Sequence, residues 1–207
     1  MNITTIPVGA LGTNCYLVWN EVTKQGFVVD PGDHFERILH EIKRNSVKVE
    51  AVLLTHAHFD HIMAVPELLE FTGAKLYVGQ AEDAVLQNPE VNLTHIHAPR
   101  LVPDVWVKDG EKHTIAGAEV LCIHTPGHTP GSFCYLMDST LFSGDTLFYG
   151  SCGRCDFPGG SVAEMYASLK RLAALDGEMR VLPGHDVETT LERERGLNPY
   201  MREAMQR

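Results

Sequence analysis

Short apolar segments alternate with amphipathic stretches along the whole chain, and this alternation predicts a mixed α/β protein. The first three apolar segments, 3–8, 15–19 and 27–30, are separated by glycine-containing turns and are predicted to be strands. Residues 49–54 form a continuous apolar run, which is typical of a strand buried on both faces. The polar, proline-containing stretch 88–103 is predicted to be a long loop rather than a domain boundary.

Two longer segments have the apolar periodicity of a helix that packs on a sheet. The first is expected to begin with a capping box formed by Asp33 and Glu36, and the second with one formed by Ser161 and Glu164. A further helix, strand and helix are expected after residue 61, ending near Gln87. The two apolar stripes consist of Phe35, Ile38, Leu39 and Ile42, and of Val162, Met165, Leu169 and Leu172.

Strand patterns return in the second half of the chain. Five short segments there are close enough in sequence to pair as antiparallel meanders, and residues 180–182 are predicted to form a last short strand. The five segments are 105–107, 112–116, 119–125, 132–137 and 140–143. Two strand-rich halves with helices between them predict an α/β fold of two packed sheets covered by helices, a four-layer α/β/β/α sandwich. We interpret residues 1–207 as a single domain.

Composition limits the partners and the compartment. The 27 acidic and 17 basic residues give a net charge of −10, with the lysines and arginines scattered, so nucleic acid and anionic membranes are poor partners. No apolar stretch approaches the ~18 residues of a membrane helix, and the first basic residue is Lys24, which does not fit a secretory leader. Five cysteines, an odd number, fit reduced thiols. We therefore expect a cytoplasmic protein, and the sequence is silent on its oligomeric state.

Histidine placement indicates a metal centre. His56, His58 and Asp60 are two residues apart, so in an extended segment they point to the same side and could share one ion or a close pair. A turn at Asp60 and His61 into the following helix would direct these two residues toward a second site. Imidazole with carboxylate suits zinc, iron or manganese, and the absence of cysteine favours a catalytic site over a closed structural zinc site.

Three motifs further along the chain add candidate ligands at strand ends. His128 lies in a Gly/Pro-rich turn between two predicted strands, Asp145 follows another strand, and His185 follows the last one. Each motif follows a strand, so the candidate ligands are expected to gather at one end of the two sheets. The order H-x-H-x-D-H, G-H, G-D-T, G-H resembles the metallo-β-lactamase-fold superfamily, and the resemblance extends from Asp30 to His185.

The resemblance implies a centre with two divalent metal ions, which we expect to be Zn²⁺, with iron or manganese as alternatives. It implies that the first ion is held by His56, His58 and His128, the second by Asp60, His61 and His185, and that Asp145 bridges them. Two ions at this distance lower the pKa of a shared water, so a metal-bound hydroxide would attack the substrate, with Asp60 and Asp145 as the catalytic carboxylates. Asp30 is implied as a hydrogen-bond support of the metal loop, with an ordinary turn aspartate as the alternative.

The run DTLFYGSCGRCDF, residues 145–157, is similar to glyoxalase II and its short bacterial relatives. This similarity implies hydrolysis of a thioester, S-lactoylglutathione or a related acyl-thiol, with Arg154 binding the small-molecule substrate. An alternative role for Arg154 is to stabilise its loop by pairing with Asp156. Few residues follow His185, so we expect no separate C-terminal helical substrate domain. Glyoxalase II has a tyrosine shortly after this histidine, whereas here His185 is followed by Asp186, Val187 and Glu188. Another thiol carrier than glutathione therefore stays open.

The same run is also similar to the persulfide dioxygenases, which supply the alternative function. In that interpretation one iron would be held by His56, His128 and Asp145. Nuclease members of the superfamily have basic surfaces that this acidic chain lacks, and a non-catalytic binding module is disfavoured because every ligand position is filled. Two pairs have no assigned role. His95 and His97 on the long loop are interpreted as an exposed pair, with a place at the pocket mouth as the alternative, and Cys152 and Cys155 are interpreted as inert thiols on a loop.

Overall fold

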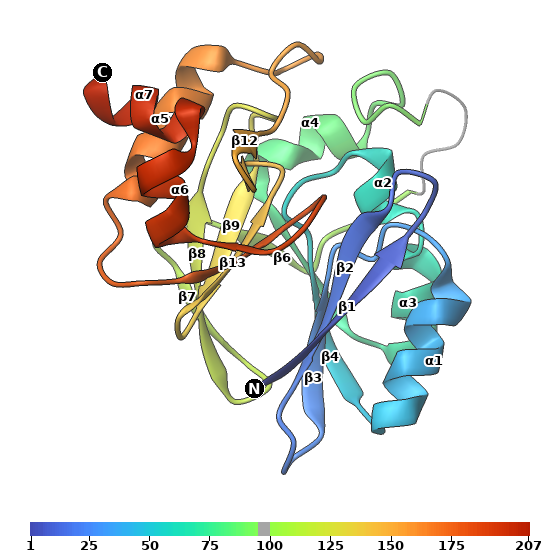
Figure 1. Ribbon diagram of the computed structural model, residues 1–207. Coiled ribbons are helices and arrows are strands. Elements are labelled where there is room, and N and C mark those ends of the chain that lie inside the picture. The colour runs from blue at the N-terminus through green and yellow to red at the C-terminus, as the bar shows by residue number, and fades with distance from the viewer. Residues whose placement is uncertain (95–99) are drawn as a thin grey trace.

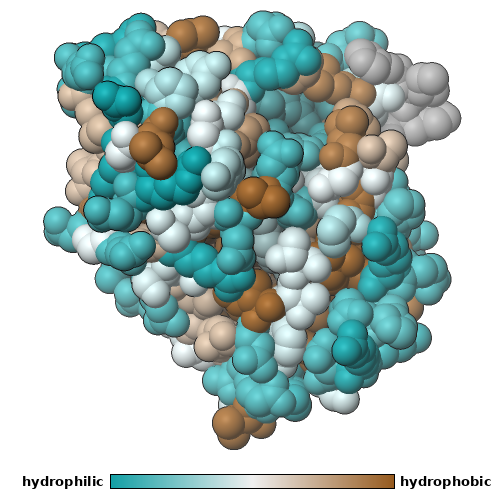
Figure 2. All heavy atoms as spheres, in the orientation of Figure 1, coloured by the Kyte–Doolittle hydropathy of each residue, from teal (hydrophilic) through white to brown (hydrophobic). Residues whose placement is uncertain are grey.

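Two six-stranded sheets face each other, and helices cover the outer surface of each sheet (Figure 1). The computed structural model describes residues 1–94 and 100–207, so the pair His95 and His97 lies outside the described residues. Among the described residues, none of the helices has both the length and the apolar character needed to cross a membrane. In the same orientation, Figure 2 shows hydrophilic residues over most of the visible face, with hydrophobic residues scattered among them.

The first sheet has the strand order β1-β2-β3-β4-β5-β6. β1 to β3 are antiparallel, whereas β3 to β6 are parallel to one another, which requires crossover connections. Helices α1 and α3 provide two of these connections and lie on the outer face of the sheet (Figure 1). The bounds are β1 (Asn2–Val8), β2 (Thr13–Trp19), β3 (Gln25–Val29), α1 (Phe35–Asn45), β4 (Lys48–Leu53), α2 (Phe59–Ile62), α3 (Val65–Thr72), β5 (Lys75–Gly79), η1 (Gln80–Glu82), α4 (Asp83–Leu86) and β6 (Val105–Val107).

The second sheet has the strand order β14-β13-β10-β9-β8-β7. Its strands β7 to β10 form the predicted antiparallel meander, and β10 pairs with β13 in parallel after the crossover through α5. The bounds are β7 (Lys112–Ile115), β8 (Ala118–His124), β9 (Phe133–Met137), β10 (Thr140–Gly144), β11 (Leu147–Phe148), β12 (Ser151–Cys152), α5 (Val162–Ala173), β13 (Arg180–Pro183), β14 (Thr189–Thr190), α6 (Leu191–Leu197) and α7 (Pro199–Gln206).

Three apolar clusters separate the four layers. The first, with Ile38 and Val52, lies between the first sheet and α1 and α3. The second joins the two sheets, where the rings of Phe27 and Phe142 meet edge to face at 6.3 Å. The third, with Leu169, packs α5 to α7 against the second sheet. The predicted α/β/β/α sandwich is confirmed.

Several local predictions were wrong. Residues 105–107 do not join the second meander, because the long segment after β5 lets β6 pair in parallel with β5. β13 is not the last strand, since β14 pairs with it and helices α6 and α7 follow. The Asp33 capping box is absent: α1 begins after His34, which has a left-handed backbone (φ 50°), and Asp33 accepts a hydrogen bond from His34 N instead. The cap at Ser161 is confirmed, because its hydroxyl accepts from Glu164 N at 3.3 Å.

Candidate metal centre

The candidate ligands follow strand ends in both sheets and meet at one end of the sandwich. His56 and His58 follow β4, Asp60 and His61 lie in the short helix α2, and the other three follow β8, β10 and β13. Their ligand atoms fall into three groups in which all atoms lie within 4.8 Å of one another. The groups are His56, His58 and His128; His56, His61 and Asp145; and Asp60, His61 and His185. The structure therefore brings together all seven residues, and their individual ligand roles remain predictions.

The first group consists of three buried histidines. His58 Nδ1 and His128 Nε2 lie 2.8 Å apart, and the rings of His56 and His128 meet edge to face at 4.7 Å. The outer nitrogens are already engaged: His56 Nδ1 lies 3.1 Å from Thr55 Oγ1, and His128 Nδ1 lies 2.7 Å from the carbonyl oxygen of Arg154. These contacts orient the rings so that their other nitrogens face inward.

The second group, by which we mean Asp60, His61 and His185, has the carboxylate of Asp145 beside it. His61 Nε2 lies 3.5 Å from both Asp60 Oδ2 and Asp145 Oδ1, and His185 Nε2 lies 3.2 Å from Asp60 Oδ2. Asp145 Oδ2 lies 3.5 Å from His128 Nε2 and from His185 Nε2. Asp145 thus faces both groups, which fits the predicted bridging position.

Buried polar atoms without partners gather at this point and test whether a cation fits. Among the residues that the structure describes, none hydrogen-bonds the buried atoms His56 Nε2, His58 Nε2, His61 Nε2 and Asp145 Oδ1. Leaving such atoms unpaired is costly unless something else binds them. Clustered imidazole nitrogens with carboxylate oxygens are the donor set that zinc, iron and manganese prefer, so the residues fit a divalent metal centre.

Two glycines explain how the chain comes so close to Asp145. A Cβ on Gly153 would lie 1.9 Å from the Asp145 carbonyl oxygen, and a Cβ on Gly184 would lie 2.2 Å from Asp145 Oδ1. Because real side chains cannot approach this closely, the glycines allow the segments after β12 and β13 to pack against Asp145.

The electrostatics differ between the two groups. Burial lowers the pKa of His56 well below its usual value and lowers the pKa of His58 to about 3, so both rings are neutral and can offer a lone pair. Burial also acts against a charge on His61, but the carboxylates of Asp60 and Asp30 outweigh it and, with Asp145, raise the pKa of His61 to about 10. The second group therefore attracts positive charge.

A hollow of about 330 Å³ opens in front of the metal cluster. His58, Asp60, His128, Asp145 and His185 line it, together with Arg154 and with the apolar residues Leu11, Phe59, Leu93, Phe148 and Phe157. The predicted substrate residue Arg154 is exposed, donates two hydrogen bonds to Asp156 at 2.9 and 2.7 Å, and lies over the Phe157 ring at 4.3 Å. The pairing with Asp156 is the alternative role expected from the sequence, and substrate binding by Arg154 remains a prediction.

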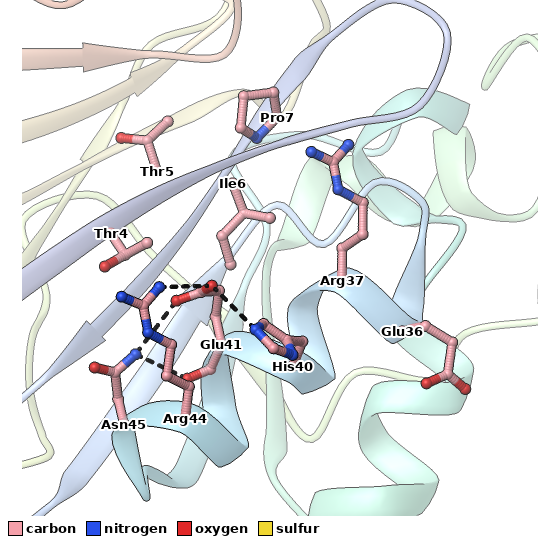
Figure 3. A pocket seen from close by; sticks show the side chains of 10 residues that line it. All are labelled: Thr4, Thr5, Ile6, Pro7, Glu36, Arg37, His40, Glu41, Arg44 and Asn45. Atoms are coloured by element: carbon pink, nitrogen blue, oxygen red, sulfur yellow. Dashed lines mark hydrogen bonds and ion pairs between the residues drawn. The ribbon is translucent and has the colours of Figure 1, made fainter.

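A larger hollow, of about 490 Å³, lies between β1 and α1 and is lined by none of the seven candidate ligands (Figure 3). Some of its polar side chains bond one another: Arg44 Nη1 donates to Glu41 Oε1 at 3.4 Å, and Asn45 Nδ2 donates to the Glu41 carbonyl at 2.9 Å. The hollow with the histidines is therefore the candidate site.

Sequence reasoning missed residues that hold the centre without belonging to a recognisable motif. Thr13 Oγ1, at the start of β2, donates to Asp60 Oδ2 at 2.8 Å. Leu11, on the preceding turn, reaches the same hollow. Only the pairing of β1 with β2 carries this turn to the metal end of the sheets, so the order of residues along the chain contained no signal for either contact.

Comparison with known proteins gives a family match over most of the chain. The family model described as Metallo-beta-lactamase superfamily matches residues 8–185. The chain is also 33% identical to the hydroxyacylglutathione hydrolase GloC of Haemophilus influenzae, and the alignment covers 97% of this chain and 98% of that protein.

Two solved structures share both the fold and about a third of the sequence. The structure of BLEG-1, a B3 metallo-beta-lactamase, has a TM-score of 0.89 and 33% identity, covering 97% of this chain and 99% of that one. TTHA1623 in a di-iron-bound form has a TM-score of 0.84 and 35% identity, covering 95% of this chain and 99% of that one.

Proposed function

The chain belongs to the metallo-beta-lactamase superfamily, and from this premise we propose that it hydrolyses a thioester of a small acyl-thiol. At the coarser level it is a metal-dependent hydrolase of that superfamily, with histidine and aspartate clusters that fit metal ions. The observation that carries the proposal is the position of Asp145 between the three-histidine group and the group of Asp60, His61 and His185.

Divalent ions held by these groups would supply a water of lowered pKa and would polarise the substrate carbonyl. The residues of the chain supply orientation. Asp60 is fixed by the Thr13 hydroxyl, and His128 is fixed by the Arg154 carbonyl, so each group has a support outside the centre. The apolar wall of Leu11, Phe148 and Phe157 suits an acyl or thiol chain and limits the approach of bulk water to the reacting carbonyl.

The thioester assignment is supported by the full-length similarity to GloC, whose name describes hydrolysis of hydroxyacylglutathione. We propose zinc in both positions, with iron as the alternative because the similar protein TTHA1623 was solved in a di-iron-bound form. The second candidate function is a persulfide dioxygenase with one iron on His56, His128 and Asp145; the di-iron form of TTHA1623 supports only the binding of iron by a similar protein.

The test is a substrate screen on one preparation of known metal content. Thiol release is measured with S-lactoylglutathione and with thioesters of uncharged thiols, and ring opening is measured with a β-lactam as comparator because BLEG-1 is a B3 metallo-beta-lactamase. We expect thioester cleavage that is lost after chelation and returns with added zinc. Hydrolysis of the lactam without hydrolysis of any thioester would contradict the proposal.

A further inference from the structure

Glu82 is a fully buried carboxylate between the two loops that carry the three-histidine group. It is the last residue of η1, and its exposed fraction is 0%. Three donors from two loops meet its oxygens: Ala57 N donates to Oε2 at 2.8 Å, Gly131 N donates to Oε1 at 2.9 Å, and Thr129 Oγ1 donates to Oε1 at 2.5 Å. Glu82 itself belongs to none of the groups of ligand atoms formed by residues 1–94 and 100–207.

The donors are placed beside the candidate ligands in the sequence. Ala57 lies between His56 and His58, and Thr129 follows His128. The Glu82 carboxylate therefore bonds two loops. Its Oε2 accepts from the backbone of the His56–His58 loop, and its Oε1 accepts from the loop that carries His128. Because His58 Nδ1 and His128 Nε2 lie 2.8 Å apart across these loops, a shift of either loop changes the spacing of the inner nitrogens.

The backbone around Glu82 is packed too closely for the carboxylate to move away. A Cβ on Gly131 would lie 2.4 Å from Glu82 N, and a Cβ on Gly79 would lie 2.5 Å from the Gly131 carbonyl oxygen. The Thr129 hydroxyl also lies 2.7 Å from Ser132 Oγ, which continues the network into β9. The segment after β5 and the loop after β8 are thus held in direct contact.

The chemistry of this contact requires a carboxylate. Burial raises the pKa of Glu82 to about 7, against the effect of the three hydrogen bonds, so its burial is costly. Two carboxylate oxygens can accept from all three donors, whereas an amide has one oxygen and would turn an N–H toward a donor. Replacing the carboxylate by an amide therefore loosens one of the two loops without changing the size of the side chain.

We propose that Glu82 is a positioning residue that holds the His56–His58 loop and the His128 loop in register and thereby sets the metal affinity of the three-histidine half of the centre. This proposal rests on the metal centre of the proposed function and does not depend on the identity of the substrate.

The experiment compares Glu82→Gln with Glu194→Gln. Glu194 serves as the control because it is also 0% exposed and accepts from Gly150 N, Thr189 and Asn198. It differs from Glu82 in also pairing with Arg193, and it bonds neither of the loops that carry the three histidines. Cobalt(II) is titrated into metal-free protein, and affinity and the visible spectrum are recorded together with the thermal midpoint. In Glu82→Gln we expect the cobalt affinity of the three-histidine group to fall roughly 10–100-fold and the visible cobalt spectrum to change. Glu194→Gln should lower the thermal midpoint and keep the cobalt affinity within about twofold.

Thr129→Val is measured in parallel, because it removes one donor and leaves Glu82 and both backbone contacts in place. We expect a smaller loss of cobalt affinity than in Glu82→Gln, and this variant decides the question if Glu82→Gln does not fold. Folded variants with wild-type cobalt affinity and spectrum would overturn the role of Glu82. Wild-type protein that binds no cobalt would overturn the metal centre itself, whereas absence of thioester hydrolysis would overturn only the proposed substrate.

Discussion

Asp30 Oδ2 lies 3.0 Å from His61 Nδ1, and both side chains are buried. The same carboxylate accepts hydrogen bonds from Thr55 N at 2.8 Å and from Thr55 Oγ1 at 2.6 Å, so it connects the end of β4 to the helix that carries His61. A carboxylate on the outer nitrogen of a histidine fixes the ring and its tautomer and leaves Nε2 free for a cation.

We therefore expect Asp30→Ala to weaken metal binding at the group of Asp60, His61 and His185 by about 10–100-fold, with a smaller effect on the three-histidine group. Metal stoichiometry at increasing chelator concentrations measures this difference. Asp33→Ala is the control, because Asp33 is an exposed acid close by whose side chain accepts a hydrogen bond from the His34 amide and lies outside the candidate centre. If Asp30→Ala and Asp33→Ala retain metal equally, Asp30 does not support metal binding at this group.

Gly32 provides a steric test of the same turn. A Cβ at this position would lie 1.6 Å from the Asp60 carbonyl oxygen, so Gly32→Ala must displace the backbone of the metal loop. We expect Gly32→Ala to lower the free energy of unfolding by about 1–3 kcal/mol and to weaken metal binding. Gly196→Ala, at an exposed position of α6 where the added Cβ would meet no described neighbour within 4 Å, should instead stabilise the protein by up to ~1 kcal/mol. Thermal unfolding of the metal-free and metal-loaded forms measures both effects.

Asp145→Ala should abolish activity and remove most of the bound metal. The carboxylate lies 3.5 Å from His61 Nε2 on one side and from His128 Nε2 on the other, so its loss leaves two cations facing each other without the negative charge between them. Metal content is measured by mass spectrometry. The control is Asp186→Asn, which removes a charge from the same hollow and keeps a residue type that tolerates its left-handed backbone (φ 63°). Near-normal loading of Asp145→Ala would exclude a bridging role.

Arg154 tests the substrate side of the hollow. If its guanidinium binds a substrate carboxylate, Arg154→Ala should raise KM for a carboxylate-bearing thioester roughly tenfold and change kcat less. Asp156→Asn should then lower KM, because Asp156 holds the guanidinium in the absence of substrate. Two results would show that the Arg154–Asp156 pair only stabilises the loop whose carbonyl bonds His128. One is an equal loss of activity of Arg154→Ala on a small neutral thioester, and the other is a loss of activity in both Arg154→Ala and Asp156→Asn.

The layers of the fold could be predicted because apolar periodicity records which face of each element is buried. β2 and β4 were recognised in this way, and the candidate ligands followed because each stands where a strand ends. Pairing between distant segments is not recorded in periodicity, so β6 was assigned to the wrong sheet. The start of α1 was also misassigned, because the left-handed backbone at His34 depends on contacts such as the bond between Gly9 N and His34 Nδ1.

Parts of the centre that depend on such long-range contacts were out of reach of the sequence. Thr13 and Glu82 lie 47 and 25 residues from the partners they bond in the metal loop, Asp60 and Ala57. Neither belongs to a motif with metal-ligand spacing, and a glutamate near a predicted helix is ordinarily a solvated surface residue. The burial of Glu82 and its three donors become visible only when the segment after β5 lies beside the loop after β8.

Asp60 separates the two candidate functions. Its Oδ2 accepts from the Thr13 hydroxyl at 2.8 Å and lies 3.2 Å from His185 Nε2, so it is the anchored carboxylate of the second group. Two-metal hydrolysis needs this group, whereas an iron oxygenase on His56, His128 and Asp145 needs only one ion with open positions.

We expect purified protein to hold about two metals per chain, and Asp60→Ala to hold about one and to lose thioester hydrolysis by orders of magnitude. Thr13→Val keeps the carboxylate without its support and should lose less. Thiol release from a thioester and oxygen uptake with a persulfide are measured on the same preparation, and one iron per chain with oxygen uptake and no thiol release would favour the dioxygenase.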